Sequence, residues 1–334
     1  MRQMQQNATK NHTKSIISEN KLRLNDGNDA LMTMSTLQFL KLSTASLLSI
    51  GLIHMAHALD LPASDRGKLL ATAGVSQAEG AAGGGLVPWA VIAGYGSEDS
   101  AGVTAFVTQL STRDYRLRSS GVALGWHDKL EVSLARQEFT GSEAPLDQLR
   151  LSQDIMGIKL KLSGDLIADQ DTWRPQLAVG AMFKQTRAVE GLSALSVTSV
   201  TQLGATDSKG VDYYVSASKL LLANNLLLNG TLRLSKGNQL GLLGFGGPQS
   251  QRYQILPEVS VAYLLSPHWV AGAEYRQRPS NLVIDREKAA KDVFLAYFPN
   301  KQWSLTLAYV SLGDITVFNP RNQQGWYLSL QLAN

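Results

Sequence analysis

Residues 121–139, "GVALGWHDKLEVSLARQEF", form two halves that alternate apolar with polar or small residues around a short polar turn. When a three-residue turn is centred on Asp128, apolar side chains from the two halves face each other on one side. The facing pairs are Trp126 with Leu130, Leu124 with Val132, and Val122 with Leu134. Alternation with a period of two is typical of a strand with one apolar surface. The stretch therefore predicts an antiparallel hairpin.

The same pattern recurs towards the C-terminus, around turns centred on Pro267 and Asn300. The facing pairs predicted there are Leu265 with Trp269, Tyr263 with Ala271, Val261 with Ala273, Val259 with Tyr275, Tyr297 with Trp303, Leu295 with Leu305, and Val293 with Leu307. Long polar or glycine-rich stretches alternate with these turns, at 139–149, 187–210, 236–251, 278–290 and 313–324. Transmembrane barrels show this alternation, with the short turns in the periplasm.

The number of strands is about fourteen if each spanning strand takes roughly ten residues. The expected strands begin near residues 67, 87, 103, 115, 130, 149, 173, 211, 226, 252, 268, 291, 302 and 325. We therefore predict an all-β fold, a transmembrane antiparallel up-and-down β-barrel of about 14 strands. Twelve strands is the alternative, because the first two segments have the weakest pattern. Closure of the barrel would leave no exposed strand edge.

Tryptophans adjoin the predicted short turns and are expected to form an aromatic girdle at one membrane interface. The girdle residues are Trp126, Trp173, Trp269 and Trp303. The final segment alternates as a last strand should, but the chain ends in Asn334 rather than in the aromatic residue common at the end of outer-membrane barrels.

Residues 34–58 have the composition of a cleaved secretory signal peptide. Lys41 precedes a largely apolar run, and small residues before the boundary predict cleavage after Ala58. Residues 1–33 lack apolar periodicity, and we interpret them as a start codon called too early or as a disordered extension. The barrel would then comprise residues 59–334 and lie in the outer membrane of a Gram-negative cell.

The charge balance argues against nucleic acid as a partner. The chain has 31 Lys and Arg and 27 Asp and Glu, a net charge of +4. Six of these basic and three of these acidic residues precede the predicted cleavage site, so the remainder has 31−6 = 25 basic and 27−3 = 24 acidic residues. A net charge of +1 is not that of a nucleic-acid-binding protein. The absence of cysteine excludes disulfides and thiolate metal sites.

Two segments resemble a known family. Residues 67–96, "GKLLATAGVSQAEGAAGGGLVPWAVIAGYG", followed by residues 121–139, are similar to the domain of unknown function 3034 family. The resemblance implies an outer-membrane barrel of Gram-negative origin. It implies no activity, ligand or catalytic residue.

The sequence offers little for catalysis or metal binding. Outer-membrane lipases, deacylases and proteases need a general base, often a histidine, near the outer rim. After the predicted cleavage site the only histidines are His127 and His268, both in predicted periplasmic turns. Asp165, Asp169 and Asp171 are close in sequence but lack the glycine and late glutamate of a calcium loop, which favours a polar turn. We therefore expect no enzyme, catalytic residue, cofactor or metal.

Charged residues on the polar faces of predicted strands are expected to point into the barrel, because lipid-facing Arg or Lys would cost about 2–4 kcal/mol near mid-bilayer. The candidate lumen-lining residues are Glu131, Lys159, Lys161, Arg233, Glu258, Glu274 and Arg276. Two interpretations remain open. The charges form a packed ion-pair network that fills the barrel, or they line a pore and select solutes.

Residues 74–96, "GVSQAEGAAGGGLVPWAVIAGYG", contain a dense glycine cluster. A phosphate loop would be followed by a helix, whereas the run after these glycines favours a strand. We expect the stretch to join the first two strands, and a loop that plugs the lumen is a further hypothesis. The candidate plug residues are Gly83, Gly84, Gly85 and Trp89.

The apolar loop 237–249 has three interpretations: a strand extension, a lumen constriction, or a contact with a hydrophobic ligand or lipopolysaccharide. Strand extension is the default among them.

The function predicted from these patterns is a passive channel or uptake barrel for small solutes. A structural or envelope-assembly barrel with a plugged lumen is the alternative, followed by an enzyme acting on lipid or lipopolysaccharide. Expected partners are outer-membrane lipid, lipopolysaccharide and the barrel-assembly machinery. The solute stays open.

Overall fold

The computed structural model describes residues 68–142, 146–192, 196–285, 287–316, 319 and 321–334. The predicted signal peptide and the segment before it lie outside the described residues. Within the described part, no helix has the length and apolar character needed to cross a membrane.

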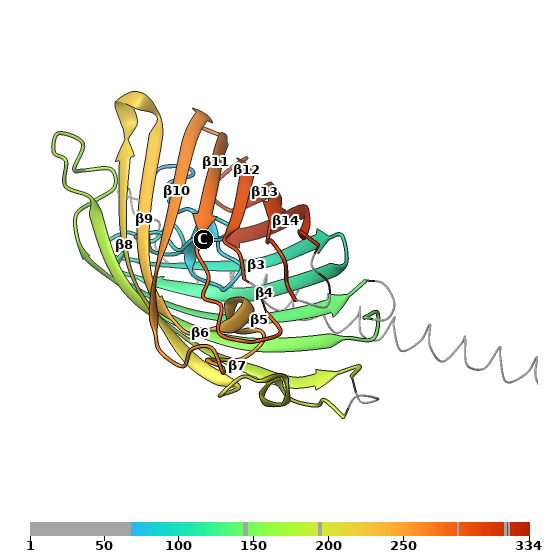
Figure 1. Cartoon of the computed structure of the whole chain (residues 1–334). Helices are drawn as coiled ribbons and strands as arrows, with labels where there is room; N and C mark the ends of the chain where they lie inside the picture. Colours follow the sequence, from blue (N-terminus) through green and yellow to red (C-terminus); the bar gives the residue numbers. More distant parts are fainter. Residues whose placement is uncertain (1–67, 143–145, 193–195, 286, 317–318, 320) are drawn as a thin grey trace, which may run out of the picture. The chain divides into compact units, whose positions relative to one another are not determined.

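Twelve antiparallel strands close into a barrel, in which each strand pairs with its sequence neighbours and β14 pairs with β3 (Figure 1). The strands are β3 (Ala101–Thr112), β4 (Tyr115–Trp126), β5 (Leu130–Gly141), β6 (Arg150–Ser163), β7 (Gln176–Glu190), β8 (Lys209–Leu221), β9 (Leu226–Ser235), β10 (Gln254–Ser266), β11 (Trp269–Arg276), β12 (Ala290–Tyr297), β13 (Trp303–Ser311) and β14 (Gln324–Ala333). The leading prediction of fourteen strands is therefore wrong, and the alternative of twelve is confirmed. The segments that begin near residues 67 and 87 are not barrel strands.

The predicted hairpin registers hold with two local differences. Around Asp128 all three facing pairs occur as predicted. Around Pro267 the pairs from Tyr263 onward occur, but an irregularity between Leu264 and Ser266 brings Ser266, not Leu265, opposite Trp269. Around Asn300 the register is shifted by two residues, so that Tyr297 faces Leu305. Because side chains alternate with a period of two, this shift keeps the apolar residues on the same face.

Loop lengths mostly alternate as predicted, with two exceptions. The connection between β3 and β4 has only two residues at the long-loop end, and the connection at 164–175 is long at the short-turn end. Short 3-10 turns occur in three other connections: η2 (Val200–Leu203), η3 (Leu222–Asn224) and η4 (Asn238–Gly241).

The wall separates two kinds of surface. Outward positions carry exposed large apolar side chains on every barrel strand, while the alternate inward positions are mostly small or polar and buried. Trp126, Trp269 and Trp303 end or begin strands at the short-turn end, and Trp173 lies in the connection at the same end. A second aromatic row at the other end, not anticipated from the sequence, comprises Tyr213, Tyr275, Tyr309 and Trp326.

Candidate functional site

The lumen contains the N-terminal segment 68–96, which we call the plug (blue in Figure 1). Its two ends lie together at the short-turn end, where Lys68 Nζ donates to Gly94 O at 3.0 Å and Tyr95 N donates to Asn334 O at 3.1 Å. Between them the chain runs into the barrel and returns through a small sheet of β1 (Val75–Ser76) and β2 (Ala82–Gly83). Nearly all plug residues from Ala71 to Gly96 are buried.

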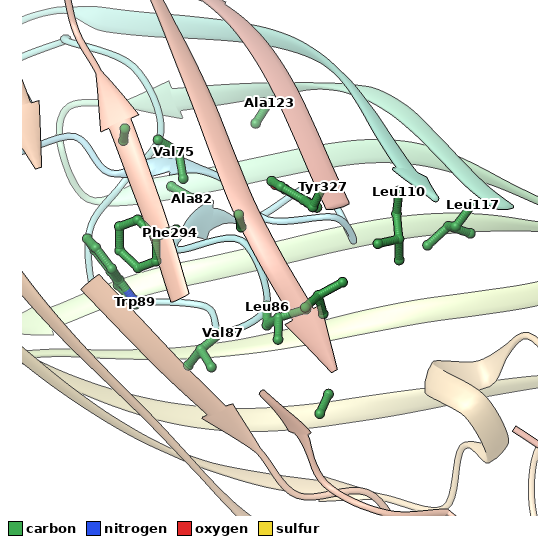
Figure 2. Packing of buried hydrophobic residues seen from close by; sticks show 14 of the residues in the cluster. Val75, Ala82, Leu86, Val87, Trp89, Leu110, Leu117, Ala123, Phe294 and Tyr327 are labelled. Atoms are coloured by element: carbon green, nitrogen blue, oxygen red, sulfur yellow. The ribbon is translucent and has the colours of Figure 1, made fainter. Parts of the chain in front are cut away.

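Apolar plug residues pack against inward residues of the wall (Figure 2). Trp89 is 4% exposed and borders a small apolar cavity together with Phe294 and Leu227. Its indole Nε1 donates to Ser260 Oγ at 2.9 Å, so the polar edge of the ring is also satisfied. The plug therefore has a core in common with the barrel instead of lying loosely inside it.

One carboxylate, Glu79, joins the plug to a group of charges on the wall that we call the ion seat. The ion seat consists of Lys184, Arg233, Arg276, Asp212 and Glu258. Arg276 Nη1 lies 2.7 Å from Glu79 Oε2 and Arg233 Nη2 lies 3.6 Å away, and Lys184 also binds Glu79 directly. Three cations thus surround one plug carboxylate.

Wall carboxylates complete the balance of this network. Lys184 Nζ lies 2.6 Å from Asp212 Oδ2. Glu258 Oε1 lies 2.5 Å from Arg233 Nε and 3.2 Å from Arg276 Nε. With Glu79 in place, three cations meet three carboxylates, and all six residues are at most 2% exposed. Burial alone would raise the pKa of Glu79, but Arg276, Lys184 and Arg233 outweigh it and hold that pKa well below its ordinary value.

Two further wall sites hold the plug by its backbone. Glu131 accepts hydrogen bonds from Ala82 N at 3.2 Å and Ala93 N at 2.8 Å, while Lys159 donates to Ala82 O at 2.8 Å and Val91 O at 2.9 Å. The Lys159 and Glu131 side chains also form an ion pair at 3.2 Å. These wall groups replace the ladder hydrogen bonds that the plug backbone lacks.

The second site surrounds Glu274 on β11. Its carboxylate accepts from Leu86 N and from Ser260 Oγ, both at 2.6 Å. The plug passes so close that a Cβ on Gly84 would lie 2.0 Å from Glu274 Oε1. A side chain at this position would fit only if the Glu274 carboxylate moved, because that carboxylate occupies the space.

The apolar loop 237–249 differs from the default expectation of a strand extension. It folds inward, where Phe245 is fully buried, and Lys184 Nζ donates to Leu240 O at 3.1 Å. Gln239 and Leu240 have positive φ angles of 46° and 63°, a conformation that costs about 1–3 kcal/mol per residue and needs surrounding contacts to hold it. Lys184 therefore touches both the plug and this loop.

The structure places most predicted lumen residues in these contacts. Glu131, Lys159, Arg233, Glu258, Glu274 and Arg276 are buried and inward-facing. Lys161 lies instead at the short-turn rim, where it binds Asp128 in the turn between β4 and β5. Lys161 has the same parity on β6 as the inward-facing Lys159, so its polar-face assignment holds, and it differs from the other lumen residues in lying near the end of the strand.

Two residues of the ion seat, and the plug carboxylate that it binds, were not anticipated from the sequence. Lys184 and Asp212 occupy inward positions on β7 and β8, where the alternation pattern could have found them. Glu79 could have been singled out in another way, because it is the only charged residue between Lys68 and Glu98 in the sequence.

The histidines and the aspartate cluster lie away from the lumen. His127 and His268 are in the turns after β4 and β10. Asp165 accepts hydrogen bonds from Ile167 N and Ala168 N, both at 2.8 Å, as in a polar turn. Within the described ranges, no three His, Cys, Asp or Glu side chains are grouped as metal ligands.

The chain matches the family described as "Protein of unknown function (DUF3034)" over residues 72–331, and it belongs to that family. No curated protein matches it.

Three solved outer-membrane proteins have a similar architecture. A KdgM porin is 7% identical with a TM-score of 0.42, and the match covers 69% of this chain and 98% of the porin. A NanC porin is 9% identical with a TM-score of 0.44 and the same coverage. Outer membrane phospholipase A from Escherichia coli is 10% identical with a TM-score of 0.39, covering 72% and 94%. Likeness of this degree does not extend to function.

Proposed function

We propose that this DUF3034 chain is an outer-membrane channel for small solutes whose lumen is closed by its own N-terminal plug. This adds a closed state to the passive channel or uptake barrel expected from the sequence, because the charged lumen residues bind the plug and one another. The state described by the structure would then be the closed one. Displacement of the plug would open the path.

The outer wall supports a membrane location. Outward residues between the two aromatic rows are apolar, as in Trp303, Leu305, Leu307 and Tyr309 on β13. The rows lie six residues apart on β11 and β13, or about 20 Å along a strand. An apolar band between aromatic girdles is the lipid-facing surface of a transmembrane barrel. A protein in water would not expose so much continuous apolar surface.

The observation that carries the channel proposal is the ion seat around Glu79. Buried ion pairs contribute little net stability, and well-packed apolar residues can replace them at no loss. A barrel that only needed filling could therefore have an apolar interior. A charged wall binding a single plug carboxylate can instead be rehydrated when the plug leaves, and it then lines a polar passage.

A structural barrel with a permanently packed lumen is the second candidate. The plug and the inward loop 237–249 favour it, because together they join strands from most of the barrel circumference. Glu131, Arg233 and Glu274 would then serve only to stiffen the wall. This candidate predicts no permeability under any condition. An enzyme of lipid or lipopolysaccharide is less well supported, since neither histidine lies at the long-loop end.

Solute flux into liposomes separates the two leading candidates. The barrel lacking residues 68–96 and the full mature chain are refolded into lipid vesicles, and heat-modifiable gel migration verifies both barrels. Swelling in small uncharged sugars is expected to be slow with the full chain and fast with the plug-deleted barrel. A folded plug-deleted barrel that admits no sugar would contradict the channel and support the structural candidate.

A further inference from the structure

Four arginines project outward from β4, β5 and β7, on the side of the barrel that has the longest strands. Together with two carboxylates they form what we call the arginine face. Its residues are Arg116, Arg118, Arg136, Arg187, Glu138 and Asp154. Side-chain exposures of 55% for Arg136 and 54% for Arg187 show that they point away from the lumen.

The members of the arginine face adjoin one another through strand pairing. Arg118 lies opposite Glu138, and Arg136 lies opposite Asp154. Arg187 Nε is 2.7 Å from Asp154 Oδ2, and Arg136 Nη1 is 3.5 Å from Asp154 Oδ1. The six residues form one patch across four strands.

The arginines outnumber the carboxylates that could neutralise them. The four guanidinium groups and the two carboxylates together have a formal charge of +2, and only Arg136 and Arg187 form ion pairs with Glu138 or Asp154. Among the described residues, no carboxylate lies within 4.0 Å of the guanidinium of Arg116 or Arg118. Arg150 and Glu190 face each other beside the patch and add no net charge. The patch is therefore an anion-binding surface by charge and by guanidinium geometry.

The arginine face lies at the boundary of the apolar band. Towards the short-turn end, the next outward residues are Leu134 on β5 and Met156 on β6. On β4 and β7 one polar residue, Ser120 or Gln185, comes before the apolar Val122 or Phe183. On the opposite side of the barrel the equivalent level carries aromatic residues such as Tyr275 and Tyr309. One sector thus has arginines where the others have an aromatic girdle, at the depth of lipid head groups.

We propose that the arginine face binds the phosphate groups of a phosphorylated lipid, of the lipid A kind, in the leaflet at the long-loop end. Arginine forks match phosphate oxygens in bidentate geometry, and the apolar residues below the patch would contact the acyl chains. The inference rests on the proposed membrane location. It does not depend on whether the plug moves.

The test measures binding of diphosphorylated lipid A to the folded chain in detergent, by native mass spectrometry. The variant Arg118→Gln/Arg136→Gln/Arg187→Gln is compared with Lys291→Gln, which removes an outward lysine from β12, away from the arginine face. The arginine variant is expected to bind about tenfold more weakly or worse, since it loses several charge-assisted contacts. The lysine control should bind as the wild type does, and lipid A stripped of phosphate should bind the wild type weakly.

Equal binding by the arginine variant and the wild type would overturn the proposal, as would equal binding of stripped lipid A. Loss of a dimer, with lipid binding unchanged, would identify the patch as a contact between two copies instead. Heat-modifiable migration verifies folding, and Arg118→Gln alone serves if the triple variant does not fold. Sugar flux through a plug-deleted barrel carrying the same substitutions should be unchanged, which keeps this test independent of the channel proposal.

Discussion

Replacement of Glu79 by glutamine is expected to turn a mostly silent barrel into one that opens frequently in planar lipid bilayers. The substitution leaves Lys184, Arg233 and Arg276 with only Asp212 and Glu258, so one buried positive charge is uncompensated. Removing one partner from a buried ion network costs about 3–5 kcal/mol. If that cost falls on the closed state, the ratio of open to closed barrels rises by about two to four orders of magnitude.

Glu98→Gln is the matched control for this substitution. Glu98 is an exposed glutamate just beyond the plug, and no ion pair within 4.0 Å is formed by it among the described residues. Its replacement should leave the recordings silent. Because the cations hold the pKa of Glu79 below its ordinary value of 4.5, this carboxylate stays charged at any pH above that value. If the folded Glu79→Gln barrel gave no more channel openings than the wild type, the ion seat would not be what holds the plug.

Gly84→Ala is expected to displace the plug by a steric route. The added Cβ would lie 2.0 Å from Glu274 Oε1, and Glu274 could move only by giving up its hydrogen bonds from Leu86 N and Ser260 Oγ. Forcing an extra methyl group into a packed site costs about 1–3 kcal/mol. The variant should open more often than the wild type, and its barrel should unfold at a lower temperature in heat-modifiable migration.

Gly85→Ala is the neighbouring control and differs from Gly84→Ala only in space. A Cβ on Gly85 would meet Tyr327 and Asp292 at 3.4–3.5 Å, which is ordinary van der Waals contact. This variant should behave as the wild type does. If both alanine variants open equally, loss of glycine flexibility would explain the result, and close contact with Glu274 would not.

The barrel wall could be predicted from the sequence because the orientation of each side chain depends only on its position along its own strand. Side chains at every second position, such as Leu305 and Leu307, face lipid, while Ser304 and Thr306 between them face the lumen. That alternation fixes which residues point outward even where the register shifts by two, as it does around Asn300. The charged residues on inward positions could be assigned to the lumen for the same reason.

The plug could not be predicted in this way because its backbone forms hydrogen bonds with residues distant in sequence. The apolar run from Leu86 to Ile92 has the composition of a strand, yet no barrel neighbour pairs with it. Its backbone groups bind wall side chains distant in sequence, as when Ser218 Oγ accepts from Ala90 N at 2.9 Å. A run buried on all sides needs no alternation, so its composition predicts a strand without showing whether the strand belongs to the wall. The partners of Glu79 likewise become evident only when strands far apart in sequence are brought together.

Chemical access to the lumen tests the central claim that the N-terminal segment fills the barrel and can be removed from it. The chain has no cysteine, so a single thiol introduced by Ser133→Cys can be labelled without background. Ser133 faces inward, is 2% exposed and is covered by the plug at Gly80. A small water-soluble methanethiosulfonate reagent is expected to leave this thiol unmodified in the full chain and to modify it rapidly in the folded barrel that lacks residues 68–96. Equal labelling rates in the two proteins would contradict the account.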